Sequence, residues 1–347
     1  MRFRSICTAL CSALVALTVG CSNESESGVS ATGGADGTTT GGAETGGTAT
    51  GGTATGGTAT GGMATGGTAT GGTATGGTVA SGGTNGSGGT SGTPTCKAAI
   101  PAINGTCPTF ATGTVTVAGL SGISLQVGAK GQGTGSLLFY WHGTGSSTAE
   151  VSTLIPSAVR QSILGQGGII VAFQSSVGTG GDCSGTATFS KDDFKVADLI
   201  AACAVRDHNI DPCRIYTTGC SAGGLQSGCM AALRSSYLAA AVPNSGGEVM
   251  EQPIQDSAHI PATMTMHGGS SDVVVIAFST TSATMDKQMK AAGGFVVNCN
   301  HGGGHCQAPA ALYTAAWEFM QAHPFGVAPE PYASGLPASF PSYCALY

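Results

Sequence analysis

Hydrophobic and polar residues alternate along the C-terminal part of the chain with two different periods. Apolar runs of strand length occupy 135–141 and 167–173, and the second run is rich in β-branched residues. Apolar positions recur at helical spacing over 194–205 and again over 310–322, where a proline precedes the first turn. These patterns predict buried strands that alternate with helices.

The middle of the same region continues the alternation. A turn at 210–213 precedes a predicted short strand at 214–218, and a predicted helix follows at 225–233. The apolar runs 238–242 and 262–266 are typical of further buried strands. Strands separated by helices favour a mostly parallel sheet with helices on both faces, so the fold class expected is α/β.

Residues 1–20 have the pattern of an export signal. Two arginines lie near the start, and the apolar stretch 9–19 is too short for a permanent membrane span. Residues 17–21 resemble the lipobox of bacterial lipoproteins, which implies that Cys21 is acylated and anchors the protein to a membrane at the cell surface or in the periplasm. The alternative is an ordinary cleaved signal peptide and a secreted protein.

Residues 21–95 consist almost entirely of glycine, threonine, alanine and serine, with Thr-Ala-Thr-Gly-Gly repeated every five residues between 48 and 77. Such a segment has little to bury, so the entropy cost of ordering it predicts a disordered tether. Residues 96–347 remain as one domain with a sizeable core.

Composition narrows the classes of function and partner. Only 9% of residues are charged, the net charge is −6, and lysine and arginine form no cluster, which argues against a nucleic-acid partner. Ten cysteines lie within 96–347, and in an exported chain an even number of cysteines favours disulfides. We expect a monomer.

Residues 219–223 have the form Gly-x-Ser-x-Gly. Glycine is so abundant here that the pentapeptide alone means little, but a predicted strand precedes it and a predicted helix follows. That context is the one in which a nucleophile elbow presents a serine at the start of a helix. The sequence therefore predicts Ser221 as a nucleophile.

A serine hydroxyl needs a histidine to remove its proton and a carboxylate to orient that histidine, and in this architecture they follow the serine as acid, then histidine. His305 ends a glycine-rich loop that starts at His301, which makes His305 the favoured base and His301 its rival. His323, at the end of a predicted helix, is expected to be a surface or capping residue.

Asp272 is the favoured acid. It follows an apolar strand and a short turn, at the end of the strand where catalytic loops gather in α/β folds. Asp256, which precedes that strand, and Glu248 are weaker alternatives.

Acyl transfer also requires two backbone N–H donors for the developing oxyanion. Ala222, directly after the nucleophile, is expected to supply one. Residues 142–145 follow a predicted strand and form a His-Gly loop, from which Thr144 is expected to supply the other; His142 would shape this loop.

Six segments of the chain together resemble the poly(3-hydroxybutyrate) depolymerase and feruloyl or acetylxylan esterase family of secreted α/β-hydrolases. In chain order they are 140–145 (YWHGTG), 192–194 (DDF), 210–224 (IDPCRIYTTGCSAGG), 240–246 (AAVPNSG), 266–272 (MHGGSSD) and 303–306 (GGHC). The resemblance implies an α/β-hydrolase fold with Asp272 and His305 completing the triad.

The cysteines that follow His305 and precede Ser221 resemble a second group, the tannases and fungal feruloyl esterases. In that group the corresponding cysteines are bridged, which implies a disulfide between Cys220 and Cys306. The alternative is that each pairs elsewhere, for example Cys306 with Cys299.

These features favour a serine esterase that hydrolyses carboxylic esters, either polyhydroxyalkanoate or side esters of plant polymers, through an acyl-enzyme. Hydrolases of this type need no cofactor and no metal. Two other hypotheses remain: a zinc-binding module built from Cys299, His301, His305 and Cys306, and an inactive lipid-anchored surface protein on a hydrolase fold.

Overall fold

A computed structural model describes residues 96–131, 135–176, 180–185 and 188–347. The predicted export signal, the lipidation of Cys21 and the linker lie outside these residues. No helix in the described part of the chain is both long and apolar enough to cross a membrane.

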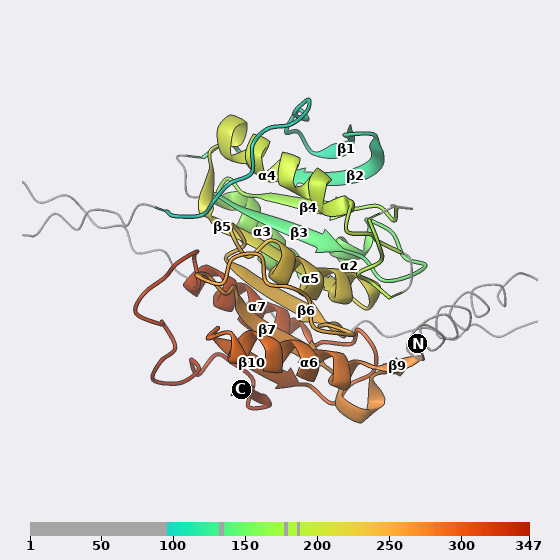
Figure 1. Ribbon diagram of the computed structural model, residues 1–347, viewed down its shortest axis with the longest axis vertical. Coiled ribbons are helices and arrows are strands. Elements are labelled where there is room, and N and C mark those ends of the chain that lie inside the picture. The colour runs from blue at the N-terminus through green and yellow to red at the C-terminus, as the bar shows by residue number, and fades with distance from the viewer. Residues whose placement is uncertain (1–95, 132–134, 177–179, 186–187) are drawn as a thin grey trace, which may run out of the picture. The chain divides into compact units, whose positions relative to one another are not determined.

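The centre of the domain is a nine-stranded sheet (Figure 1) in the order β1-β2-β4-β3-β5-β6-β7-β10-β11. Strands β4, β3, β5, β6, β7 and β10 pair in parallel, and antiparallel pairs form both edges. The strands are β1 Gly113–Val117, β2 Leu120–Val127, β3 Gly135–Trp141, β4 Ile169–Phe173, β5 Ile210–Cys220, β6 Ala240–Asn244, β7 Ala262–His267, β10 Val296–Asn300 and β11 Cys344–Leu346.

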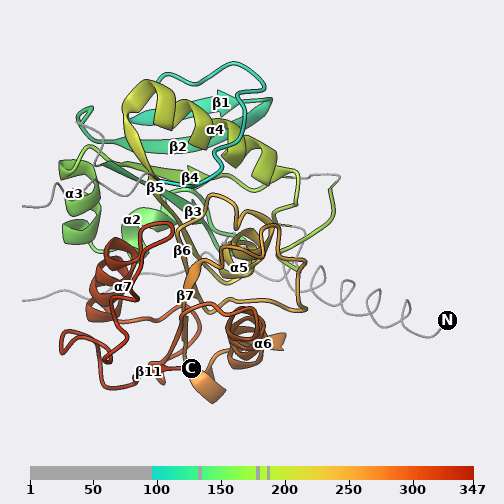
Figure 2. The same cartoon turned by 60° about the vertical axis from the view of Figure 1, so that its left-hand side comes forward.

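Helices cover both faces of the sheet, as Figure 2 shows. One face packs against α4 (Asp193–His208), α5 (Ala222–Leu233) and α6 (Phe278–Ala291). The other packs against α2 (Glu150–Leu154), α3 (Ser157–Gly165) and α7 (Ala310–Ala322). A separate hairpin, β8 (Val273–Val274) and β9 (Ile276–Ala277), lies between β7 and α6.

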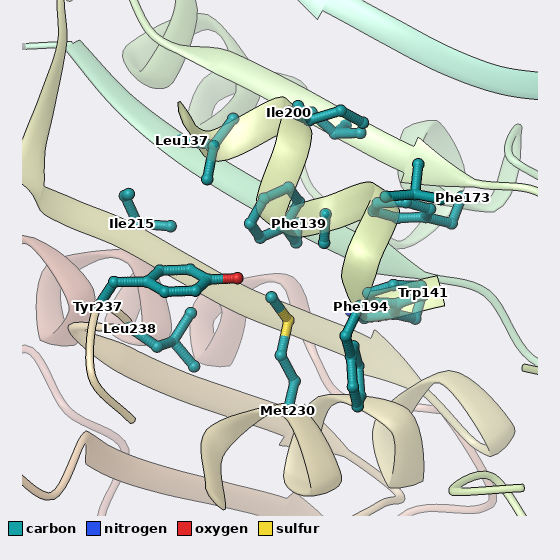
Figure 3. Packing of buried hydrophobic residues seen from close by; sticks show 14 of the residues in the cluster. Leu137, Phe139, Trp141, Phe173, Phe194, Ile200, Ile215, Met230, Tyr237 and Leu238 are labelled. Atoms are coloured by element: carbon teal, nitrogen blue, oxygen red, sulfur yellow. The ribbon is translucent and has the colours of Figure 1, made fainter. Parts of the chain in front are cut away.

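The central strands are buried on both faces, which explains their nearly continuous apolar sequences. Figure 3 shows Phe139 and Trp141 of β3 packed with Phe173 of β4 and Phe194 of α4. The rings of Trp141 and Phe173 stack with centroids 4.0 Å apart. This packing fixes the end of β3, where the loop containing His142 begins.

The predicted strand 135–141 and the predicted helix 310–322 are confirmed to the residue. The turn predicted at 210–213 was wrong, because β5 runs through it. Gly135 pairs with Ile210 but Leu137 pairs with Ile215, so the intervening residues form an irregularity in the ladder. Pro212 has no N–H to donate, and such a break in pairing accommodates it.

His323 lies at the end of α7 as expected but is buried, with 1% of its surface exposed, so its placement on the surface was wrong. Its Nδ1 bonds to the Phe319 carbonyl at 2.7 Å, and its Nε2 bonds to Glu330 at 2.8 Å. His323 therefore both caps the helix and holds the segment that follows it.

Five disulfides join the ten cysteines of the domain. The pairs are Cys96–Cys213, Cys107–Cys203, Cys183–Cys229, Cys220–Cys306 and Cys299–Cys344. The last pair attaches the edge strand β11 to β10, so the C-terminal segment adds a strand to the sheet.

Candidate active site

Ser221 lies at the sharp turn between β5 and α5. Its φ of 58° and ψ of −122° fall where non-glycine residues are rare, which is a strained backbone of the kind found at functional sites. The flanking glycines make the turn possible, because a Cβ on Gly219 or Gly223 would lie 2.4 or 1.8 Å from the Trp141 carbonyl oxygen. The Ser221 N–H donates to the Asn244 carbonyl at 3.2 Å, so the turn is also tied to β6.

Asp272 is fully buried beyond the end of β7, after a single 3₁₀ turn over Gly269–Ser271. Its Oδ2 accepts the Gly268 N–H at 3.1 Å. Burial raises the pKa of Asp272, but hydrogen bonds from His305, Gly268 and Ser245 outweigh burial and leave that pKa below its ordinary value. The Asp272 carboxylate therefore stays ionised at neutral pH.

The His305 ring reaches this carboxylate from the loop after β10. Its Nδ1 lies 2.7 Å from Asp272 Oδ1, and 23% of its side chain is exposed. The Phe278 ring packs against the imidazole with centroids 4.5 Å apart. With Nδ1 held by the acid, Nε2 is the nitrogen left to act as a base.

Cys220 and Cys306 form a disulfide with their α-carbons 5.9 Å apart, as the resemblance implied. A ring nitrogen of His305 and the two sulfurs all lie within 4.8 Å of one another. The disulfide thus joins the residue before Ser221 to the residue after His305. Among the described residues, no hydrogen bond links the Ser221 hydroxyl to His305; such contacts are often long without substrate and tighten in the complex.

Ser245, which the sequence analysis did not single out, lies between these groups. Its hydroxyl accepts the Cys306 N–H at 2.9 Å and is hydrogen bonded to Asp272. Its N–H donates to the Met266 carbonyl at 2.7 Å. In the sequence Ser245 falls within the family-like segment 240–246, a few residues after the predicted strand 238–242, and neither feature specifies a contact.

The His-Gly loop lies beside the nucleophile. A Cβ on Gly143 would be 3.4 Å from the Ser221 Cβ. His142 is buried, with its Nδ1 2.7 Å from the Gly143 carbonyl and its Nε2 3.1 Å from the Ser175 hydroxyl, so this side chain shapes the loop. Thr144 is exposed, and its hydroxyl lies 2.9 Å from that of Thr188.

Ala222 is the first residue of α5 and is buried directly after Ser221. A free N–H at this position is typical of a helix start, where the helix dipole also favours negative charge. Ala222 begins α5 and Thr144 follows Gly143, the loop residue beside Ser221; their role as a pair of oxyanion donors stays a prediction.

The residues considered as alternative base or acid make contacts outside the Asp272–His305 pair. His301 accepts the Gly303 N–H at 3.2 Å through Nδ1, and burial lowers its pKa. Asp256 accepts the Ala258 N–H at 2.9 Å in a surface turn. Glu248 is buried, and burial together with the nearby Glu251 raises its pKa to about 8. None of the three is hydrogen bonded to His305 or Ser221 in the described residues.

The cysteine ligands proposed for zinc are bonded elsewhere. Cys299 pairs with Cys344 and Cys306 pairs with Cys220, so neither sulfur is a free thiolate. A site built from Cys299, His301, His305 and Cys306 would therefore lack two of its ligands.

Comparison with solved structures places the chain in a known architecture. A variant of pOPH in complex with DMSO matches with a TM-score of 0.56 and 14% identity, over 71% of this chain and 96% of that one. Native pOPH matches with a TM-score of 0.55 and 16% identity over 70% and 97%, and native sOPH with 0.52 and 15% over the same shares. No family model and no curated protein matches the sequence.

The sheet order, the helices on both faces and these matches define the class: the domain has the α/β-hydrolase fold. Within this fold the turn between β5 and α5 is the position of the nucleophile elbow. Ser221 occupies that position, and the bonded pair of Asp272 and His305 lies beside it.

Proposed function

We propose that the protein is a serine esterase that hydrolyses carboxylic esters through an acyl-enzyme. The observation that carries the proposal is the bonded Asp272–His305 pair, which a disulfide holds beside a serine in a strained elbow. This arrangement matches the roles of acid, base and nucleophile in acyl transfer.

In the proposed reaction His305 Nε2 takes the proton of the Ser221 hydroxyl as its oxygen attacks the ester carbonyl. Thr144 and Ala222 donate their N–H groups to the oxyanion. The tetrahedral intermediate collapses when His305 gives its proton to the leaving alcohol. Water then attacks the acyl-enzyme with His305 again as base, which releases the carboxylic acid and restores Ser221.

The surroundings of the acid favour an ester with a large apolar part, such as a polyhydroxyalkanoate or an aromatic side ester of a plant polymer. Val273, Val274 and Val275 leave Asp272 as a hairpin and are about half exposed, at 55%, 50% and 44%. Val275 has a φ of 68°, a costly backbone for a β-branched residue. An exposed apolar turn that also carries strain is better explained by substrate contact than by stability.

We further propose that the enzyme acts as a monomer outside the cytoplasm, attached to a membrane through acylated Cys21. Five disulfides in the described domain support an oxidising compartment. Metabolic labelling with a radioactive fatty acid, compared between the natural chain and Cys21→Ala, tests the anchor: label on both chains or on neither contradicts it.

The test of the activity is turnover of a panel of acetyl, feruloyl and 3-hydroxybutyrate esters by the natural protein and by Ser221→Ala. We expect hydrolysis of at least one ester class by the natural protein and a loss of at least about 10³-fold in Ser221→Ala. A natural protein that turns over none of them would favour the inactive surface protein. Full activity in Ser221→Ala would mean that another residue is the nucleophile.

A further inference from the structure

Glu150, at the start of α2, makes contacts that the acyl-transfer scheme does not use. Its Oε1 accepts a hydrogen bond from the Tyr140 hydroxyl at 2.8 Å. The same carboxylate accepts the Gly143 N–H at 3.0 Å through Oε1 and at 3.2 Å through Oε2. One side chain thus links the end of β3 to the loop beside the nucleophile.

This carboxylate is close to the reacting centre. A Cβ on Gly143 would lie 3.5 Å from Glu150 Oε2 and 3.4 Å from the Ser221 Cβ. Only the glycine of the loop therefore separates the carboxylate from the nucleophile. A Cβ at this position would be in van der Waals contact with both.

Hydrogen bonds fix the orientation of two consecutive peptide units of the loop. Glu150 holds the N–H of Gly143, while the Gly143 carbonyl accepts hydrogen bonds from His142 Nδ1 at 2.7 Å and from the Ser146 N–H at 3.0 Å. In a planar trans peptide the C=O and N–H point in opposite directions, so fixing the Gly143 carbonyl also fixes the Thr144 N–H.

Tyr140 anchors the carboxylate to the sheet. Its side chain is buried, and burial, followed by the charge of Glu150, raises its pKa. The phenol therefore keeps its proton and remains a donor to Glu150 over the whole pH range of an esterase. Since Tyr140 belongs to β3, its hydrogen bond ties the loop to a buried strand inside the sheet.

We propose that Glu150 is a positioning residue that preorganises the loop so that the Thr144 N–H is aimed at the oxyanion. The inference rests on the proposed esterase function and deepens it. A carboxylate suits the task because it accepts from Tyr140 and Gly143 at once, and a hydrogen bond to an ionised acceptor is stronger than a neutral one. Displaced donors lose much of their effect, and loss of one oxyanion donor lowers kcat by about 10²–10³.

The test compares Glu150→Ala, Glu150→Gln and Tyr140→Phe with the natural protein in ester hydrolysis and in inhibition by a trifluoromethyl ketone. That inhibitor forms a hemiketal on Ser221 whose oxyanion needs the same donors as the transition state. For Glu150→Ala we expect kcat to fall about 10- to 100-fold, KM to change less than threefold, and the inhibition constant to rise in proportion to the fall in kcat.

Glu150→Gln keeps one acceptor oxygen and should recover part of the loss. Tyr140→Phe leaves the carboxylate in place, so its kcat should lie between that of Glu150→Gln and that of the natural protein. Glu251→Ala removes the same charge from an exposed position and serves as the matched control. Thermal unfolding of each variant separates misfolding from mispositioning.

If Glu150→Ala has the melting temperature, kcat and inhibition constant of the natural protein, the inference about Glu150 is wrong. The esterase assignment is unaffected by that result. A parallel loss of kcat and melting temperature without a change in the inhibition constant would reduce Glu150 to a structural role. A natural protein that hydrolyses no ester and binds no trifluoromethyl ketone would instead refute the proposed function.

Discussion

Ser245 contacts the acid Asp272 and Cys306, the residue after His305, from a position that the sequence did not reveal. Its hydroxyl is hydrogen bonded to Asp272 and accepts the Cys306 N–H, so it connects the acid to the segment that carries His305. At the scale of single residues the two members of the acid–base pair are thus held by a common neighbour as well as by each other.

We predict that Ser245→Gly lowers kcat/KM about 5- to 150-fold, since a buried N–H left without its acceptor costs about 1–3 kcal/mol. Glycine is the suitable replacement because Ser245 has a φ of 43°. Removing a hydrogen bond to ionised Asp272 raises the pKa of that acid. The acidic limb of the pH profile should therefore move to higher pH.

The control for this prediction is Ser227→Ala, which removes a buried hydroxyl from α5, where its partner is Thr217 rather than a triad residue. We expect an unchanged pH profile for Ser227→Ala. If Ser245→Gly also retains the natural profile and rate, Ser245 only fills space.

At the scale of elements, the loops at the carboxyl ends of β5, β6, β7 and β10 bring the site residues together. The Cys220–Cys306 disulfide connects the first of these loops to the last across 86 positions of the sequence. The His305 loop contains three glycines in a row and would otherwise have many conformations.

We predict that replacing both Cys220 and Cys306 with serine lowers kcat at least about tenfold and destabilises the fold by about 2–4 kcal/mol, because the loop regains its freedom. The matched control replaces Cys107 and Cys203, a pair with a similar sequence separation of 96 that joins the segment before β1 to α4. The control should lose comparable stability but keep kcat per folded molecule. Equal kcat in both double variants would show that the disulfide does not position His305.

The sequence predicted most of the elements that form this site, because they are buried and strongly patterned. The apolar patterns of strand β3 and helix α7 each fit only one type of secondary structure. Asp272 was predicted as the acid because it follows a buried strand. Helix α6 was missed, since its first half is rich in serine and threonine, which favour turns as readily as helices.

Contacts between segments distant in the sequence could not be predicted in this way. Glu150 and Ser245 are ordinary residues locally, and their roles arise from β3, β6 and β10 lying in the same sheet. The bridge between Cys220 and Cys306 came from a family resemblance rather than from spacing, because ten cysteines permit many pairings.

At the scale of the whole molecule, burial of acids links stability to pH. The Glu248 carboxylate is buried, and burial followed by the charge of Glu251 raises its pKa to about 8. Between its ordinary pKa of 4.5 and about 8 the folded protein binds more protons than the unfolded chain. Stability therefore falls as the pH rises through this range.

We predict that Glu248→Met raises the melting temperature at pH 8 by several degrees, because it removes an acid that must either stay protonated or be buried as a charge. The gain should shrink at pH 5, where the Glu248 carboxyl is protonated in the folded protein. Asp207→Asn, at an exposed position on α4, is the control. A gain that is the same at both pH values would contradict the raised pKa.

The central claim, that His305 activates Ser221, is tested most directly by covalent labelling with a fluorophosphonate followed by peptide mass spectrometry. We predict a single adduct on the peptide that contains Ser221, formed at a rate that falls at least about 10³-fold in His305→Ala and Asp272→Asn and is unaffected in His301→Ala. An adduct on another residue, or an undiminished rate in His305→Ala, would contradict the account.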